Sequence, residues 1–200
     1  MKDKKVAAIV MAAGFSSRMH AFKPLLPLMD STVVETTVAV FQKAGILNVT
    51  VVIGHERERM ASYLAQCGID YVVNEAYALG MFGSIQVGEA TLKSDMCAFF
   101  VMPVDIPSVK PSTISLLTEY FDADQMDVLY PTYRDKRGHP PLISSRLSNA
   151  IRTFGGQGGL KALLNDGRWR ISHLEVDDEG ILMDIDDQGA YEEMFKKMKG

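Results

Sequence analysis

The chain has 200 residues, of which 47% are hydrophobic and 23% charged, and this composition predicts a single globular domain over residues 1–200 with a substantial core. The formal net charge of −4 argues against a nucleic-acid partner, because proteins of that class usually carry a basic excess. No apolar segment approaches the roughly 20 residues that span a bilayer, so we expect a cytoplasmic protein without a membrane partner. The two cysteines, Cys67 and Cys97, lack zinc-ligand spacing and lie in apolar stretches, which predicts buried thiols.

Continuously apolar runs predict strands at residues 6–11, 49–53, 71–73, 98–102 and 128–132. Strands that are apolar on both faces are typical of a parallel sheet covered by helices. Three helices are predicted to start at the capping-box pair Thr32 and Glu35, near Glu56 and at Pro111. Further helices are predicted after residues 80, 147 and 159 and over residues 191–198. This alternation predicts a three-layer α/β fold with a mostly parallel central sheet, in which the loops after the strands share one ligand-binding rim.

The first predicted strand continues into small residues followed by two cations: Ala12, Ala13, Gly14, Ser16, Ser17, Arg18 and Lys23. A glycine among small residues lets backbone N–H groups turn toward an anion. The guanidinium of Arg18 can grip phosphate oxygens as a fork, and Lys23 adds a point charge. The segment therefore predicts a polyphosphate-binding loop. It matches neither GxxxxGK[ST] nor GxGxxG, and a plain turn between strand and helix is the alternative.

Residues 74–85 read NEAYALGMFGSI and form the second candidate segment. Gly80 and Gly83 precede or open a predicted helix that has Ser84 in its first turn. Free N–H groups and the helix dipole favour an anion at that position. A glycine-rich turn without a ligand explains the same pattern equally well.

Residues 101–107 read VMPVDIP and place Asp105 directly after a buried strand, between two prolines that stiffen the loop. A carboxylate on the ligand-binding rim is well placed to hold Mg²⁺ that bridges phosphate oxygens. An aspartate between prolines is also a common turn former. Its position at the end of a strand favours the metal hypothesis.

Three later segments carry further candidates. Arg137 and His139 lie in RGHPP, where the histidine can hydrogen-bond a ligand or serve a structural role. Gly158 lies in GGQGG, whose glycines allow either a flexible gate or a close backbone approach to a ligand. Residues 178–180 predict a hairpin turn with solvated charges, and Asp184 and Asp186 can point the same way from an extended segment.

The loop over residues 11–28 matches the pattern LAAGxSxRMGxxKxLLP at Ala12, Ala13, Gly14, Ser16, Arg18, Met19, Lys23, Leu25, Leu26 and Pro27. It thereby resembles the nucleotidyltransferases that attach CMP or GMP to molybdenum cofactor, the family of MobA-like NTP transferase domains. The family forms N…GMxxS, GDxP, RGHPV and DIDTPxDY also have counterparts here. The chain departs from the family at His20, at Gly156, at Gly159 with Leu160, and at Asp187 with Gln188.

The resemblance implies a Rossmann-like nucleotidyltransferase fold and Mg²⁺-dependent transfer of CMP from CTP to the terminal phosphate of molybdopterin. By the same resemblance, the catalytic residues are Arg18, Lys23 and Asp105, with Mg²⁺ at Asp105 and Asp186. Asn74, Gly80 and Ser84 join the loop in binding nucleotide, whereas Arg137, His139 and Gly158 lie on the acceptor side. A molybdenum enzyme that receives the product is a conceivable partner. The alternatives are a sugar-1-phosphate or methylerythritol-phosphate type nucleotidyltransferase and a non-catalytic chaperone that delivers the cofactor.

Overall fold

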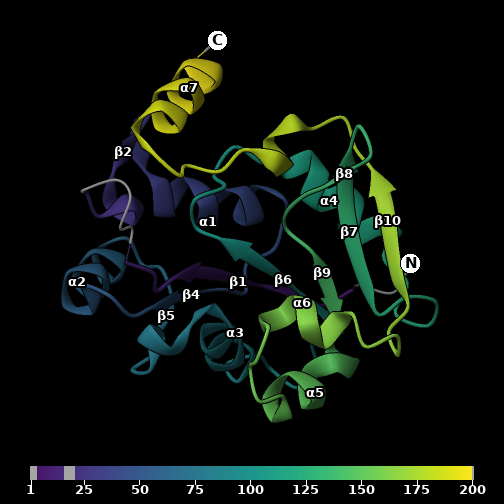
Figure 1. Cartoon of the computed structure of the whole chain (residues 1–200). Coiled ribbons are helices and arrows are strands. Elements are labelled where there is room, and N and C mark those ends of the chain that lie inside the picture. Colours follow the sequence, from purple (N-terminus) through teal and green to yellow (C-terminus); the bar gives the residue numbers. More distant parts are fainter. Residues whose placement is uncertain (1–3, 16–20, 200) are drawn as a thin grey trace.

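The computed structural model describes residues 4–15 and 21–199. Its centre is an eight-stranded sheet in the order β10-β7-β9-β6-β1-β4-β5, with β8 paired to β7 (Figure 1). The strands are β1 (Val6–Ala12), β4 (Val49–Ile53), β5 (Tyr71–Val73), β6 (Ala98–Pro103), β7 (Val128–Tyr133), β8 (Lys136–Arg137), β9 (Leu142–Ser144) and β10 (Ile171–Glu175). Within the described residues, β8 and β9 are the strands of this sheet that run antiparallel to their neighbours. The predicted α/β class and mostly parallel sheet are confirmed.

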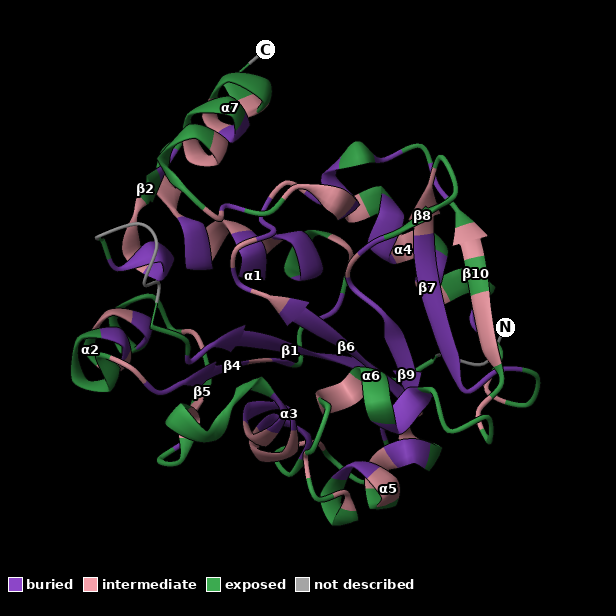
Figure 2. Ribbon diagram, in the orientation of Figure 1, coloured by how far each residue is buried: buried purple, intermediate pink, exposed green. Residues whose placement is uncertain are grey.

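Helices cover both faces of the sheet and complete the three predicted layers (Figure 1). One face carries α1 (Val33–Lys43), α2 (Arg57–Gln66), α4 (Pro111–Tyr120) and α7 (Gln188–Lys199), and the other carries α3 (Met81–Glu89), α5 (Ser148–Thr153) and α6 (Gly159–Leu164). Along β1, Ala8 and Val10 pack in the core on the α1 face, whereas Ile9 and Met11 pack in the core on the α3 face. The strand is buried along its whole length (Figure 2). Because successive side chains of a strand point to opposite faces, this central strand is apolar at every position.

Short elements connect the layers near the carboxyl end of β1. The 3₁₀ helix η1 (Lys23–Leu25) and the hairpin of β2 (Pro27–Leu28) and β3 (Ser31–Thr32) lead into α1, and η2 (Tyr77–Leu79) leads into α3. Two further 3₁₀ helices are η3 (Ser145–Leu147) and η4 (Glu179–Leu182). The Tyr191 hydroxyl donates to the carbonyl of Pro27, which holds α7 beside β2 (Figure 1).

None of the helices in the described part of the chain has the length and apolar character needed to cross a membrane.

The predicted capping box at the start of α1 is confirmed, and Glu35 is its centre. Burial acts to raise the pKa of this carboxyl, but hydrogen bonds from Tyr63, Ser31, Cys67 and Thr32 outweigh burial and lower the pKa from 4.5 to about 2. The carboxylate therefore links the β2–β3 hairpin, α1 and α2 through its charged form.

Glu35→Gln is expected to destabilise the protein by about 1–2 kcal/mol at neutral pH, because an amide cannot accept this set of hydrogen bonds. A carboxyl whose pKa is lower in the folded state stabilises the fold above its unfolded pKa. That contribution is lost as the pH falls from 4.5 toward about 2. Urea unfolding of both proteins over a series of pH values should show the difference in unfolding free energy shrinking across this window. A pH-independent difference would contradict this account.

The predicted hairpin turn with solvated charges is wrong at Asp178, which is buried at 2% exposure. Its carboxylate accepts hydrogen bonds from the backbone N–H of Lys110 at 2.8 Å and from the Thr113 hydroxyl at 2.7 Å. It also accepts one from the Gly180 N–H at 3.0 Å. Asp178 therefore satisfies donors at the first turn of α4 and ties η4 to that helix.

The predicted burial of both thiols is also wrong. Cys67 is exposed because it caps the carboxyl end of α2, and Cys97 is only partly buried just before β6.

Candidate functional site

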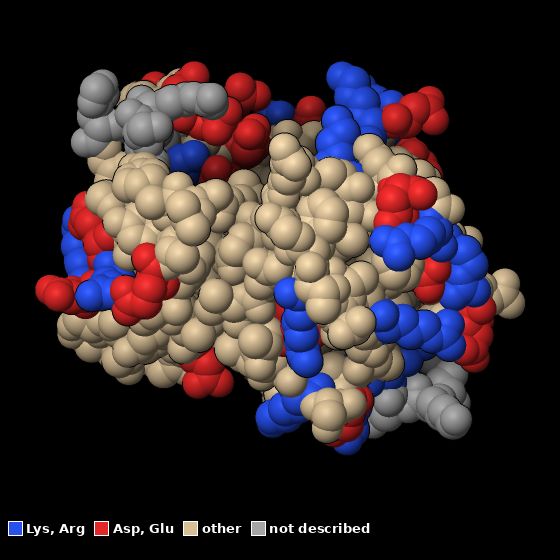
Figure 3. Space-filling model, turned by 60° about the horizontal axis from the view of Figure 1, so that its bottom comes forward, with Lys and Arg blue, Asp and Glu red and all other residues tan. Residues whose placement is uncertain are grey.

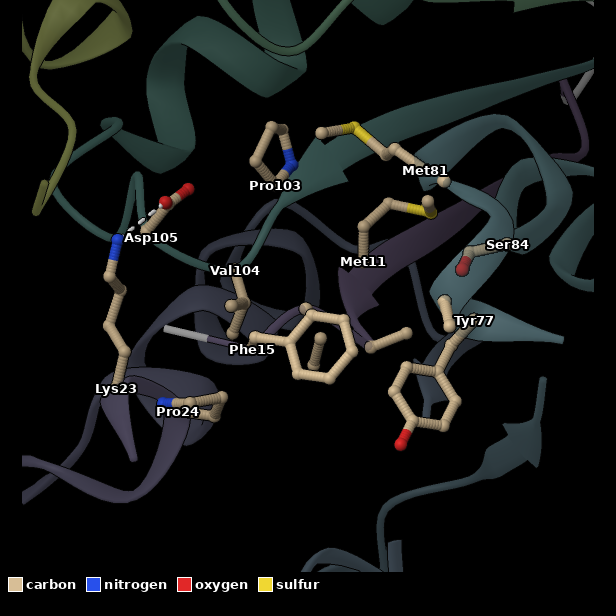
Figure 4. Close-up of a pocket in the computed structure, with 15 residues that line it drawn as sticks. Met11, Phe15, Lys23, Pro24, Tyr77, Met81, Ser84, Pro103, Val104 and Asp105 are labelled. Atoms are coloured by element: carbon tan, nitrogen blue, oxygen red, sulfur yellow. Dashed lines mark hydrogen bonds and ion pairs between the residues drawn. The ribbon is translucent and has the colours of Figure 1, made fainter. Parts of the chain in front are cut away.

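A cavity of about 390 Å³ opens at the carboxyl ends of β1 and β6 (Figure 4). It brings together predicted residues from well-separated segments: Ala12, Ala13 and Gly14 after β1, Gly80 and Ser84 at the start of α3, and Lys23 and Asp105. In Figure 4, Lys23 and Asp105 lie at one end of the cavity, and Tyr77 and Ser84 lie at the other. The cavity therefore has a charged end and a largely apolar end.

The charged end consists of Lys23 and two carboxylates. The Lys23 Nζ atom is 3.0 Å from Oδ2 of Asp105 and 3.8 Å from Oδ1 of Asp186. Lys23 is only 8% exposed. It is the first residue of η1, and Pro24 after it restricts the backbone. A cation held this far from solvent interacts more strongly with anions than a surface lysine does.

Backbone hydrogen bonds hold the segments of the charged end together. The N–H of Val104 donates to the carbonyl of Met11 at 3.1 Å, and the N–H of Ile185 donates to the carbonyl of Asp105 at 2.9 Å. The buried hydroxyl of Thr37 on α1 donates to the carbonyl of Val104 at 2.8 Å. The loop that carries Asp105 is thereby fixed to β1, to α1 and to the segment that carries Asp186.

Asn74 lies behind the cavity wall. It is 3% exposed, and its Nδ2 donates to Oγ of Ser84 at 2.9 Å. Its Oδ1 accepts from the N–H of Ala76 at 3.0 Å. Asn74 therefore orients Ser84 and the chain before η2, and its predicted contact with nucleotide stays a prediction. Gly80 has a φ of +119°, which only glycine adopts readily, so the turn into α3 requires it.

None of the predicted acceptor residues is among the described residues that line this cavity. His139 nevertheless lies within electrostatic range of it. Burial is the main reason why the pKa of His139 is lowered, and the positive charge of Arg137 lowers it further. The negative charges of Asp105 and Asp184 act in the opposite direction. The Nδ1 atom of His139 is buried and has no hydrogen-bond partner. Every other buried side-chain nitrogen or oxygen in the described part of the chain has one.

Arg137 and Gly158 lie farther along the sheet. The Arg137 guanidinium lies 4.4 Å from the ring centroid of Tyr130, which stacks at 6.0 Å on His173. Gly158 precedes α6 with a φ of +77°, and a Cβ there would come within 2.7 Å of the Cβ of Ala162. The positive φ and this close approach explain the glycine by backbone geometry, and its acceptor role stays a prediction.

Sequence reasoning missed the aromatic part of the site. The Phe15 ring lies 5.3 Å from that of Tyr77 and 5.0 Å from that of His55, and Phe15 is 53% exposed beside the cavity. Tyr77 is set in place by Gly54, where a Cβ would come within 2.5 Å of the Tyr77 Cβ. The one usable sequence signal was an aromatic residue directly after Gly14, at the mouth of the predicted loop.

The predicted residues Ser16, Ser17 and Arg18, and the departure at His20, lie outside the described residues. Among the described residues, no group of three or more His, Cys, Asp or Glu side chains is arranged to hold a metal ion. Asp105 at the charged end of the cavity and Asp186 close to Lys23 supply two carboxylates. That set suits Mg²⁺, which takes one or two carboxylates and completes its shell with water and substrate phosphates.

Figure 3 shows the face that includes the α3 side of the molecule. Charged side chains of both signs lie along the edges of this face, with Lys and Arg most frequent at the right and lower right, and its centre is largely uncharged.

A family model described as the MobA-like NTP transferase domain matches residues 8–174. Molybdenum cofactor cytidylyltransferase from Escherichia coli (strain K12) is 28% identical over 185 residues, which cover 90% of this chain and 91% of that protein. Bifunctional protein GlmU from Geotalea daltonii is 30% identical over 118 residues, which cover 58% of this chain and 26% of that protein.

Among solved structures, Rv0371c from Mycobacterium tuberculosis H37Rv has a TM-score of 0.85 at 26% identity and covers 96% of this chain and 98% of its own. A structure of Rv0371c in complex with manganese has a TM-score of 0.78 at 25% identity, with the same coverage. These neighbours agree with the α/β fold described above.

Proposed function

The chain belongs to the family of MobA-like NTP transferase domains, and from this premise we propose that it transfers CMP from CTP to the terminal phosphate of a molybdopterin-type acceptor, with release of pyrophosphate. Two observations support the choice of substrates. Ala12, Ala13 and Gly14 resemble the AAG form of the cytidylyl branch of the family, whose guanylyl members tend to carry AGG. A relative named molybdenum cofactor cytidylyltransferase aligns over 90% of the chain.

The observation that carries the proposal is the polarity of the cavity. At one end, Lys23 and Asp105 meet although they are 82 positions apart in the chain. At the other end lie the ring of Tyr77 and the start of α3. A nucleoside triphosphate has the matching polarity, because its tail is anionic and its base is a planar ring with an apolar face.

The chain's own residues would act by positioning and by charge. Lys23 and the backbone N–H groups of residues 13 and 14 would bind the triphosphate and neutralise charge as the pyrophosphate leaves. The attacking acceptor phosphate has a second pKa of ~6 and is already ionised at neutral pH, so the reaction needs no general base. Asp105 and Asp186 would hold Mg²⁺, which when bound adds positive charge beside the phosphates.

His139 and Arg137 are proposed to face the acceptor. The His139 Nδ1 is buried and lacks a hydrogen-bond partner, so it would contact an acceptor only after a local rearrangement, whereas the exposed Arg137 suits an anionic group directly. Gly156, Gly159 and Leu160 replace family residues on this side, so the test compares several phosphorylated acceptors.

The test is steady-state pyrophosphate release with Mg²⁺, CTP and a panel of phosphorylated acceptors: molybdopterin, a sugar 1-phosphate and methylerythritol phosphate. The proposal expects turnover with molybdopterin. Turnover with another acceptor in its place would assign the sugar-phosphate or methylerythritol-phosphate alternative. Absence of release with every acceptor, at a CTP concentration shown to saturate the protein, would assign a non-catalytic role.

CTP is expected to stabilise the protein more than GTP does. A ligand at about 100 times its Kd adds about 2.7 kcal/mol to the unfolding free energy, and for a chain of this size that raises Tm by several degrees. Thermal unfolding with equal concentrations of CTP, UTP, ATP and GTP in Mg²⁺ measures this directly. Equal shifts with CTP and GTP would contradict the proposed base preference.

A further inference from the structure

We propose that the Lys23 ammonium is a built-in cation of the carboxylate pair Asp105 and Asp186, and that it competes with a divalent metal ion for these carboxylates while no nucleotide is bound. The inference rests on the proposed function in one respect: a bound triphosphate would draw the Lys23 ammonium away from the carboxylates, because it offers Lys23 other anionic oxygens. The carboxylates then become available to the metal at the step where the metal is needed.

The first support is the contact itself. The Lys23 Nζ lies 3.0 Å from Asp105 Oδ2, which is a direct ion pair, and 3.8 Å from Asp186 Oδ1. Mg²⁺ would be held by the same two carboxylates. An ammonium at hydrogen-bond distance from Asp105 and a divalent cation on the same carboxylate repel one another, and the low exposure of Lys23, 8%, limits how far water screens the ammonium.

The second support is that the two segments that carry these carboxylates are held together. Ile185, beside Asp186, donates its N–H to the carbonyl of Asp105 at 2.9 Å, so the two acidic segments are joined directly. Thr37 fixes the neighbouring carbonyl of Val104 from α1. Two carboxylates held near each other repel in the absence of a cation, and the ammonium compensates that charge within the folded protein.

The third support is the donor set. Over residues 4–15 and 21–199, no three acidic, histidine or cysteine side chains are arranged as a metal site, and Mg²⁺ commonly completes its shell with water or with phosphate oxygens. Two carboxylates that already interact with an ammonium give little metal affinity of their own. A bound triphosphate would raise the metal affinity in two ways, because it attracts Lys23 away from the carboxylates and supplies ligand oxygens.

The test measures Mn²⁺ affinity without nucleotide, from the electron paramagnetic resonance signal of free Mn²⁺. We expect Lys23→Gln to bind Mn²⁺ about tenfold more tightly than the wild type or better, because the competing charge is gone. Lys23→Arg should stay close to the wild type. The control Lys43→Gln removes one positive charge from an exposed site at the end of α1 and should leave Mn²⁺ affinity unchanged.

The double variant Lys23→Gln/Asp105→Asn locates the effect. It should lose the gain of the single variant, because the gain is assigned to the Asp105 carboxylate. A Lys23→Gln variant that is folded by circular dichroism and binds Mn²⁺ no more tightly than the wild type overturns the proposal. A gain that persists in the double variant overturns it as well.

A comparison that leaves Lys23 intact keeps the proposal testable if the Lys23 variants do not fold. Asp105→Asn alone should change Mn²⁺ affinity by less than about twofold, because Lys23 already competes for that carboxylate in the wild type. Tight Mn²⁺ binding by the wild type that depends on Asp105 overturns the proposal. None of these measurements uses nucleotide or acceptor, so their failure is distinct from a failure to release pyrophosphate.

Discussion

Asp105→Asn is expected to lower kcat/KM for pyrophosphate release by on the order of 10³-fold, because the amide keeps the shape of the side chain and loses its charge. The substitution removes the carboxylate oxygen that lies 3.0 Å from the Lys23 Nζ. If Asp105 serves as a metal ligand, the loss should be reduced in part at high Mn²⁺ or Mg²⁺ concentration. Initial rates over a metal titration measure both effects.

The matched control is Asp70→Asn, which removes an exposed carboxylate just before β5. It should retain wild-type rates. The thermal midpoint of Asp105→Asn should stay near that of the wild type, since Asp186 also lies close to Lys23 and limits the cost of the lost ion pair. Near-normal turnover by a folded Asp105→Asn protein would remove Asp105 from the catalytic site.

The parts of the fold that follow local rules could be predicted from sequence. β4 and β5 have the predicted bounds, and α1 begins at the predicted capping box, because continuous apolar runs and the Thr32–Glu35 pair are local signals. β10 was missed because it is a half-exposed edge strand that lacks a continuous apolar run. β9 was missed because a three-residue antiparallel strand has almost no local signature.

The site divides in the same way. The convergence of Lys23 and Asp105 followed from the rule that loops at the carboxyl ends of parallel strands share one rim. Asp186 was assigned to the site by the family resemblance, and it lies 3.8 Å from Lys23. Two features depend on contacts between distant segments and could not be predicted: the support of Tyr77 by Gly54 and the buried hydrogen bonds of Asp178. A pattern of residue types shows which chemistry is available, whereas these contacts decide how it is arranged.

Lys23→Ala is expected to lower kcat/KM by on the order of 10²–10³-fold, through the loss of the buried charge that is proposed to contact the triphosphate. If Lys23 binds the phosphates equally in the ground state and the transition state, KM for CTP should rise with kcat little changed. If it acts mainly on the leaving pyrophosphate, kcat should fall as well. Steady-state kinetics over a CTP titration separate the two cases.

Lys43→Ala is the matched control, because it shortens an exposed lysine on α1 and should retain wild-type rates. The proposed dual role of Lys23 gives the experiment a second, independent readout. Removing a residue that only binds phosphate should not change the affinity of the nucleotide-free protein for Mn²⁺. Removing a residue that also competes for Asp105 and Asp186 should raise that affinity while turnover falls. Opposite changes in the same variant would be hard to explain by general damage to the fold, since damage should weaken both.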